Sequence, residues 1–171
     1  TILPITVDEK GENKIEIIPE KAQMGYLQGY SDPEYIEKLQ TISLPFLRNG
    51  KFRAFPASGD SMPPFKNGTF IVGKYVENVD DLKKSKTYIF ITRNEGVVYK
   101  RFEKKTARAI TVSSDNPLYK PYDIKLSDLV EIWEYACSIN TAEFETETLD
   151  MITVKEMFLS LKKEIDLIKK K

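Results

Sequence analysis

The chain has 171 residues, of which 41% are hydrophobic and 30% charged, as in ordinary globular proteins. Basic and acidic residues both number 26, so the chain lacks the positive excess of a protein that coats nucleic acid. Histidine is absent and Cys137 is the only cysteine, which excludes a Ser-His-Asp triad, a zinc site and an intramolecular disulfide. We therefore expect one main domain that uses no metal and no cofactor.

The first 30 residues mix polar and apolar positions and contain Pro4, Gly11, Pro19, Gly25 and Gly29. This pattern is typical of an extended arm rather than a helix, and it predicts a linker over residues 1–30. Because the chain begins with Thr1 rather than methionine, we expect a fragment or a processed product of a longer protein.

The sequence contains no candidate membrane segment. Its apolar runs stay well short of the roughly 20 residues that a membrane-spanning helix needs. The N-terminus also lacks the apolar core of a signal peptide. With a single cysteine, these features favour a cytoplasmic location and no contact with a membrane.

A short helix is predicted over about residues 33–39. Ser31 and Glu34 have the spacing of a capping box, and Pro33 stands where the first turn of a helix tolerates proline. This helix would open the main domain, which we place at residues 31–140.

From Phe52 to about Ile139 the chain consists of short β-rich segments separated by turn residues. These segments are FRAFPA, TFIVGKYV, TYIFIT, VVYKRF, AITV and LVEIWEYACSI. They predict a mostly β fold, preceded by an N-terminal arm and one short helix and followed by a C-terminal helical extension.

Residues 141–171 are predicted to form a second linker and an amphipathic helix. Thr153 and Glu156 form another capping-box spacing, so the helix should begin near Val154. Its apolar residues follow the four-three spacing of a coiled-coil seam: Val154, Phe158, Leu161, Ile165 and Ile168. A helix that docks on its own domain explains the same pattern, and Leu159 and Leu167 favour it because they widen the apolar face.

The stretch SGDSMPP places Ser61 where a strand-forming run ends, either as a turn residue or as a nucleophile. A serine hydroxyl attacks an amide only when a base removes its proton, and without histidine the available base is an unprotonated lysine. Burial lowers the pKa of a lysine by up to about 3 to 5 units, toward the range useful for general-base chemistry.

Lys100 is the candidate base. It lies in the second strand of a predicted hairpin whose turn is Asn94 to Gly96. Side chains alternate across a strand, so Lys100 shares a face with Val98 and Phe102, and it enters the core if they do. The alternative is a lysine at a sheet edge with its amine in water.

The segment GDSM around Ser61, followed by KNGTFIVG and by Lys100 in VVYKRF, resembles the Ser-Lys peptidase domain of LexA and phage repressors. The resemblance extends through SSDNPLYKPYDI and LVEIWEYACSI. It implies a LexA-like β fold in which Ser61 is the nucleophile and Lys100 the general base. By the same resemblance, the backbone amides of Asp60 and Ser61 would form the oxyanion hole.

Members of this family cut their own chain at an Ala-Gly or Cys-Gly bond before the domain, in response to a RecA filament. In KAQMGYLQGY the equivalent bond is Met24-Gly25. Methionine is larger than the alanine or cysteine expected before the cleaved bond. The substrate pocket that receives this side chain would therefore have to be roomier, or cleavage would be slower.

The resemblance implies the C-terminal dimerisation and autoproteolysis half of a repressor in the SOS class. The homodimer would reach DNA through a helix-turn-helix domain absent from this chain. Two alternatives are a non-catalytic dimerisation and ligand-sensing module, and a processed accessory subunit of a translesion DNA polymerase. Signal peptidases share the Ser-Lys chemistry, but the lack of a membrane segment counts against them.

Overall fold

The computed structural model describes residues 13–19, 23–143 and 147–170. The chain divides into two units, residues 1–141 and residues 142–171. The first unit contains all the described strands, and the second contains a single described helix.

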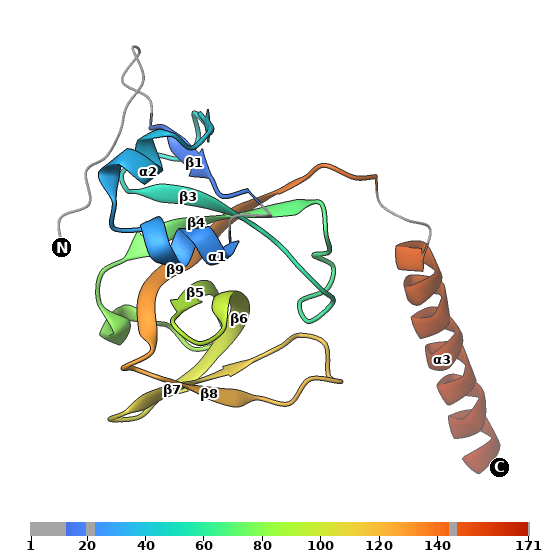
Figure 1. The fold of residues 1–171 in the computed structure, drawn as a ribbon. Coiled ribbons are helices and arrows are strands. Elements are labelled where there is room, and N and C mark those ends of the chain that lie inside the picture. The colour runs from blue at the N-terminus through green and yellow to red at the C-terminus, as the bar shows by residue number, and fades with distance from the viewer. Residues whose placement is uncertain (1–12, 20–22, 144–146, 171) are drawn as a thin grey trace. The chain divides into compact units, whose positions relative to one another are not determined.

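The first unit is built on a nine-stranded sheet with the order β2-β1-β3-β4-β9-β5-β6-β7-β8 (Figure 1). The strands are β1 (Ile15–Ile17), β2 (Thr41–Ile42), β3 (Phe52–Pro56), β4 (Thr69–Val76), β5 (Thr87–Thr92), β6 (Gly96–Lys105), β7 (Ala109–Ser113), β8 (Tyr122–Lys125) and β9 (Leu129–Asn140). β1 runs parallel to β3, while the other neighbouring strands are antiparallel. The predicted mostly β fold is confirmed.

The six predicted β segments correspond to β3, β4, β5, β6, β7 and β9. The predicted hairpin is formed by β5 and β6, which pair from Thr92 and Gly96 to Thr87 and Arg101. β1, β2 and β8 escape prediction because their lengths of 3, 2 and 4 residues are too short to show an alternating pattern.

The extended arm predicted for residues 1–30 is wrong at residues 23–29, which form the helix α1 (Gln23–Gly29). Residues 15–17 are extended, but they belong to the sheet as β1. Gly29 permits close packing rather than flexibility, because a Cβ atom there would lie 2.6 Å from the ring of Tyr35. Residues 1–12 and 20–22 of the predicted arm lie outside the described residues.

The helix predicted near residue 33 is present as α2 (Pro33–Glu37) and ends before the predicted residue 39. Its N-cap is Asp32 rather than Ser31, because the Asp32 carboxylate accepts a hydrogen bond of 3.0 Å from the amide of Glu34. A short 3₁₀ helix, η2 (Val79–Asp81), follows β4.

The core of this unit has three clusters of buried side chains. One lies under α1 and α2 and joins Tyr26 to Phe55 and Trp133. The second joins Tyr88 and Phe102 with apolar residues of β7, β8 and β9. The third is formed by Ile15, Phe52, Ala54 and Val72. The strand that carries Lys100, β6, and the two strands that flank Ser61, β3 and β4, therefore all contribute side chains to a packed core.

The second unit contains the helix α3 (Glu147–Lys169), coloured red in Figure 1. The C-terminal helical extension is present, but the predicted start near Val154 is wrong, since the helix begins seven residues earlier. Residues 147–153 contain neither proline nor glycine, and acidic residues suit the N-terminal end of a helix. Thr153 therefore lies inside the helix instead of capping it.

Candidate active site

Ser61 lies in the loop of residues 57–68 that connects β3 to β4. Gly59 adopts a φ of 73°, a left-handed conformation that a side chain would disfavour, so the loop can turn sharply before Ser61. Met62 is buried next to Ser61, and its sulfur accepts a hydrogen bond of 3.3 Å from the amide of Asp115. The loop is thus fixed on both sides of a partly exposed serine.

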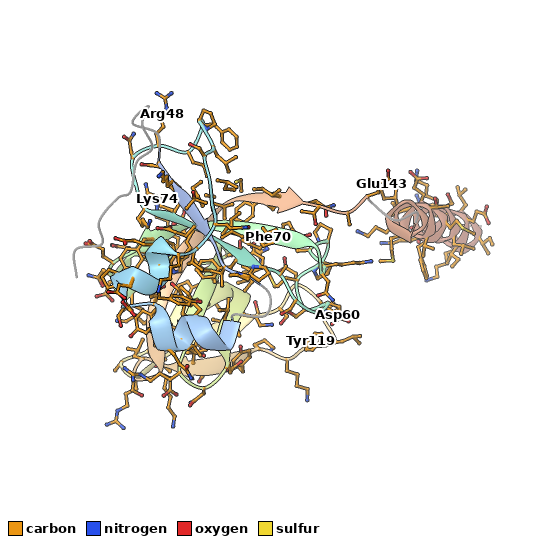
Figure 2. All side chains as sticks on the ribbon, turned by 45° about the horizontal axis from the view of Figure 1, so that its top comes forward. Arg48, Asp60, Phe70, Lys74, Tyr119 and Glu143 are labelled. Carbon is orange, nitrogen blue, oxygen red and sulfur yellow. The ribbon has the colours of Figure 1, made fainter. Side chains whose placement is uncertain are left out.

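A second loop, between β7 and β8, holds the backbone around Ser61. The amide of Asn116 donates to the carbonyl oxygen of Ser61 at 3.0 Å, and its side-chain amide donates to the carbonyl oxygen of Asp60 at 3.1 Å. The hydroxyl of Tyr119 donates to the Asp60 carboxylate at 2.5 Å, and Figure 2 shows these two side chains together. Because a trans peptide places N–H opposite C=O, Asn116 also sets the direction of the Ser61 amide.

Lys100 projects from β6 toward Ser61. Its ammonium nitrogen Nζ lies 2.9 Å from Ser61 Oγ and 3.0 Å from Ser114 Oγ, and it donates to both hydroxyls. As predicted, Lys100 shares a face with Val98 and Phe102, and only 9% of it is exposed. The interpretation as a surface lysine at a sheet edge is therefore wrong.

The surroundings of Lys100 favour its neutral form. Burial lowers the pKa of its amine below the ordinary value of 10.5, while the negative charge of Glu95 acts in the opposite direction. The two hydrogen-bond partners, Ser61 and Ser114, are uncharged hydroxyls that do not stabilise an ammonium as a carboxylate would. A neutral amine at this position can accept the proton of the serine.

Ser61 and Lys100 line a cavity of about 180 Å³. Most of the other lining side chains are apolar: Phe55, Pro56, Ala57, Met62, Phe65, Ile71, Ile89, Val97, Val98 and Tyr99. Several of them also belong to the cluster under α1. The pair therefore stands at a hollow suited to an apolar side chain of a substrate.

The Met24-Gly25 bond lies within α1. Tyr26 follows this bond in α1 and is fully buried. Its hydroxyl donates a hydrogen bond to Glu131 and accepts one from Arg53, the latter with a length of 2.7 Å. Glu131 also accepts from Trp133 Nε1 at 2.8 Å. A buried polar network thus holds α1 against the sheet, and Met24-Gly25 is not in the extended form that a peptidase binds.

The sequence predicts no role for Ser114, Asn116 or Tyr119, although all three belong to the segment SSDNPLYKPYDI. Ser114 contacts Lys100, Asn116 contacts Asp60 and Ser61, and Tyr119 contacts Asp60. These contacts arise only because β7 and β8 bring their connecting loop beside residues 57–68. A turn rich in serine, asparagine and proline predicts a loop but not its neighbours.

Two further properties of the described residues bear on the site. No group of three or more Cys, Asp or Glu side chains in them is arranged to hold a metal ion. Among the helices of the described part of the chain, none is both long and apolar enough to cross a membrane.

Comparison with known protein families places these features in context. Residues 16–136 match the model of the Peptidase S24-like family. The chain belongs to the Peptidase S24-like family. Ser61, Lys100 and the Met24-Gly25 bond all fall within the matched part of this S24-like chain, while α3 lies outside it. No curated protein matches the sequence. Membership of this family supports a LexA-like domain of the repressor or peptidase type, which is the type of domain that the sequence motifs indicate.

Proposed function

We propose that this chain is the self-cleaving and dimerising half of a repressor-type transcriptional regulator, with Ser61 as nucleophile and Lys100 as general base. The observation that carries the proposal is the distance of 2.9 Å between Lys100 Nζ and Ser61 Oγ, beside an apolar cavity. An activated nucleophile needs its base within hydrogen-bond reach, and a buried lysine supplies one at moderate pH.

The proposed reaction begins with a neutral Lys100. Ser61 Oγ attacks the scissile carbonyl carbon while its proton passes to Lys100 Nζ. The backbone amides of Asp60 and Ser61 stabilise the oxyanion of the tetrahedral intermediate. When the C–N bond breaks, the Lys100 ammonium returns a proton to the leaving amine, and an ester on Ser61 remains. Water then hydrolyses the ester, again with Lys100 as base.

The proposed substrate is the Met24-Gly25 bond of the chain itself. An apolar cavity beside Ser61 fits the unbranched apolar side chain of methionine better than a pocket shaped for alanine would. Because the bond lies in α1, cleavage requires this helix to unwind first. We therefore expect slow cleavage without an inducer such as a RecA filament, and a faster reaction when α1 is destabilised.

Cleavage would act on DNA binding through dimerisation. A dimer that places two helix-turn-helix domains on two half-sites binds DNA more tightly than separate monomers do. Cutting between those domains and the dimerising sheet would remove this advantage once the N-terminal piece leaves the sheet.

The test is prolonged incubation of the purified chain at alkaline pH, followed by intact mass measurement. We expect two products, residues 1–24 and 25–171, and none from Ser61→Ala. Lys100→Ala should fold normally and stay uncut. A cleaved Ser61→Ala variant, or a Lys100→Ala variant that is cut as fast as the parent, would contradict the proposal.

A second candidate is a non-catalytic dimerisation and ligand-sensing module, and the helical state of Met24-Gly25 favours it. A peptide with the sequence of residues 20–30 separates the two candidates, because a free peptide need not be helical. If Ser61 and Lys100 are active, the chain cuts this peptide in trans after its methionine. If neither the peptide nor the chain is cut at any pH, the pair is idle.

A further inference from the structure

The helix α3 carries a stripe of exposed apolar side chains. Six of them repeat with the four-three spacing of a coiled-coil seam, and each is between 46% and 73% exposed: Met151, Val154, Phe158, Leu161, Ile165 and Ile168. A stripe of this size on an isolated helix is costly in water, because every one of these side chains stays hydrated.

The early start of α3 lengthens the seam. Since the helix begins at Glu147, the seam also includes Met151, one position of the repeat before Val154. Its six residues span about 26 Å along the helix at 1.5 Å per residue. In heptad positions, Met151, Phe158 and Ile165 are a residues, while Val154, Leu161 and Ile168 are d residues. The other exposed apolar residues on the helix do not belong to this seam, and Leu159 occupies an outer b position.

The charges beside the seam select the partner. Its e positions are all lysines, Lys155, Lys162 and Lys169, and they are exposed. In a parallel pair of helices, a g residue faces the e residue of the next heptad, so Glu164 meets Lys169 of the other copy. In an antiparallel pair, e faces e, and lysines would oppose lysines, which is unfavourable.

We propose that α3 binds α3 of a second copy of this chain as a parallel, in-register coiled coil. The seam supplies the apolar contact, and Glu164 with Lys169 supplies the complementary charges. This interface lies in residues 147–169, outside the residues 16–136 that match the family. Its test requires neither Ser61 nor cleavage.

Disulfide cross-linking of the full chain tests both the partner and its direction. In a Cys137→Ser background, Val154→Cys should form a covalent dimer in oxidised glutathione, because d residues of parallel helices meet their own counterparts. Lys163→Cys, on the outer surface of the helix, serves as control and should cross-link at least tenfold more slowly. Equal rates would mean random collision and would overturn the proposal.

Two further outcomes would also overturn it. Val154→Cys that cross-links only when mixed with Ile165→Cys indicates antiparallel helices, because residue 154 of one helix then faces residue 165 of the other. The absence of any cross-link indicates a helix that packs elsewhere, for instance on its own sheet.

A matched pair of leucines tests the seam itself. Leu161→Glu places a charge in the seam, and Leu159→Glu makes the same change at an exposed position outside it. Added to Val154→Cys, Leu161→Glu should slow cross-linking at least tenfold, whereas Leu159→Glu should leave the rate within twofold. Equal effects of the two substitutions would contradict the assigned face.

Discussion

Lys100 combines a buried amine with two neutral hydroxyl partners, and this environment determines how the proposed reaction depends on pH. Burial lowers its pKa, so the amine loses its proton at a lower pH than an exposed lysine does. The active form is the neutral amine, and its population grows as pH rises toward that lowered pKa.

We therefore expect the cleavage rate to rise by about tenfold per pH unit below the pKa of Lys100 and to level off before pH 10.5. Initial rates measured by mass spectrometry between pH 6 and 10 provide the profile. Lys104→Ala, which removes an exposed lysine from the same strand, should leave it unchanged. A rate that falls as pH rises would exclude Lys100 as the base.

Asn116 is a positioning residue, because it holds the carbonyl oxygens of both Asp60 and Ser61 and touches no reacting atom. Asn116→Ala removes the side-chain bond to Asp60 and leaves the peptide between Asp60 and Ser61 less well oriented. We expect cleavage to slow by roughly 10- to 100-fold, less than the roughly 100- to 1000-fold loss that follows when an oxyanion donor is removed outright. The midpoint of the pH profile should not move, and a shifted midpoint would show that Asn116 acts on Lys100 instead.

At the scale of elements, α1 is held to the sheet by a tyrosine whose hydroxyl is buried between Arg53 and Glu131. Burial raises the pKa of both Tyr26 and Glu131, and the short contact between them keeps the tyrosine neutral as a donor. The aromatic ring also packs edge-on against Phe55, with ring centroids 5.6 Å apart. Unwinding α1 breaks the polar and the apolar contacts together.

Tyr26→Phe keeps the ring and removes only the hydroxyl. We expect a loss of about 1–3 kcal/mol in the free energy of unfolding, because Glu131 and Arg53 each lose a buried partner. Self-cleavage should accelerate by about tenfold or more, since about 1.4 kcal/mol corresponds to a factor of ten in the unwound population. Denaturant titration and intact mass provide the two measurements.

Tyr35→Phe is the matched control. The Tyr35 hydroxyl is buried in the same region and has no hydrogen-bond partner among the described residues. Its removal should leave stability and cleavage rate unchanged or raise stability slightly. If Tyr35→Phe accelerates cleavage as much as Tyr26→Phe does, the polar network is not what holds α1.

These elements also show what the sequence can predict. β4, β5 and β6 follow from β-branched and aromatic runs between turn residues, and the side-chain alternation in β6 predicts the face of Lys100. α1 is missed because Gly25 and Gly29 indicate a flexible arm in isolation. Tyr35, which requires a glycine at residue 29, is a tertiary neighbour that local patterns do not reveal.

The residues of the candidate site also divide into those that the sequence predicts and those that it does not. Ser61 and Lys100 are predicted as a candidate pair from strand alternation and from the resemblance of the motifs around them to a known family, both of which can be read from local sequence. Asn116 and Tyr119 reach the site only through the pairing of β7 with β8, and no spacing in the sequence announces that contact. The polar partners of α1 come from β3 and β9, far away in the chain, and were likewise unpredicted.

At the scale of the whole molecule, the place of β1 has a consequence for what a cut would achieve. β1 precedes Met24 and lies between β2 and β3, and Ile15 is fully buried. Within it, the buried Glu16 forms an ion pair of 2.5 Å with Lys51. Hydrolysis after Met24 breaks the covalent chain but none of these contacts.

The two pieces should therefore remain together as a nicked, non-covalent complex, comparable to a split protein reassembled from its fragments. Native mass spectrometry after cleavage should show the mass of the intact chain plus one water, while denaturing conditions should show two pieces. Glu16→Ala should shorten the lifetime of the nicked complex. If the short piece departs as soon as it is cut, β1 does not retain it. If the complex persists, the step that would switch the proposed regulator is the departure of β1 from the sheet, and hydrolysis would only permit that step by cutting the covalent link.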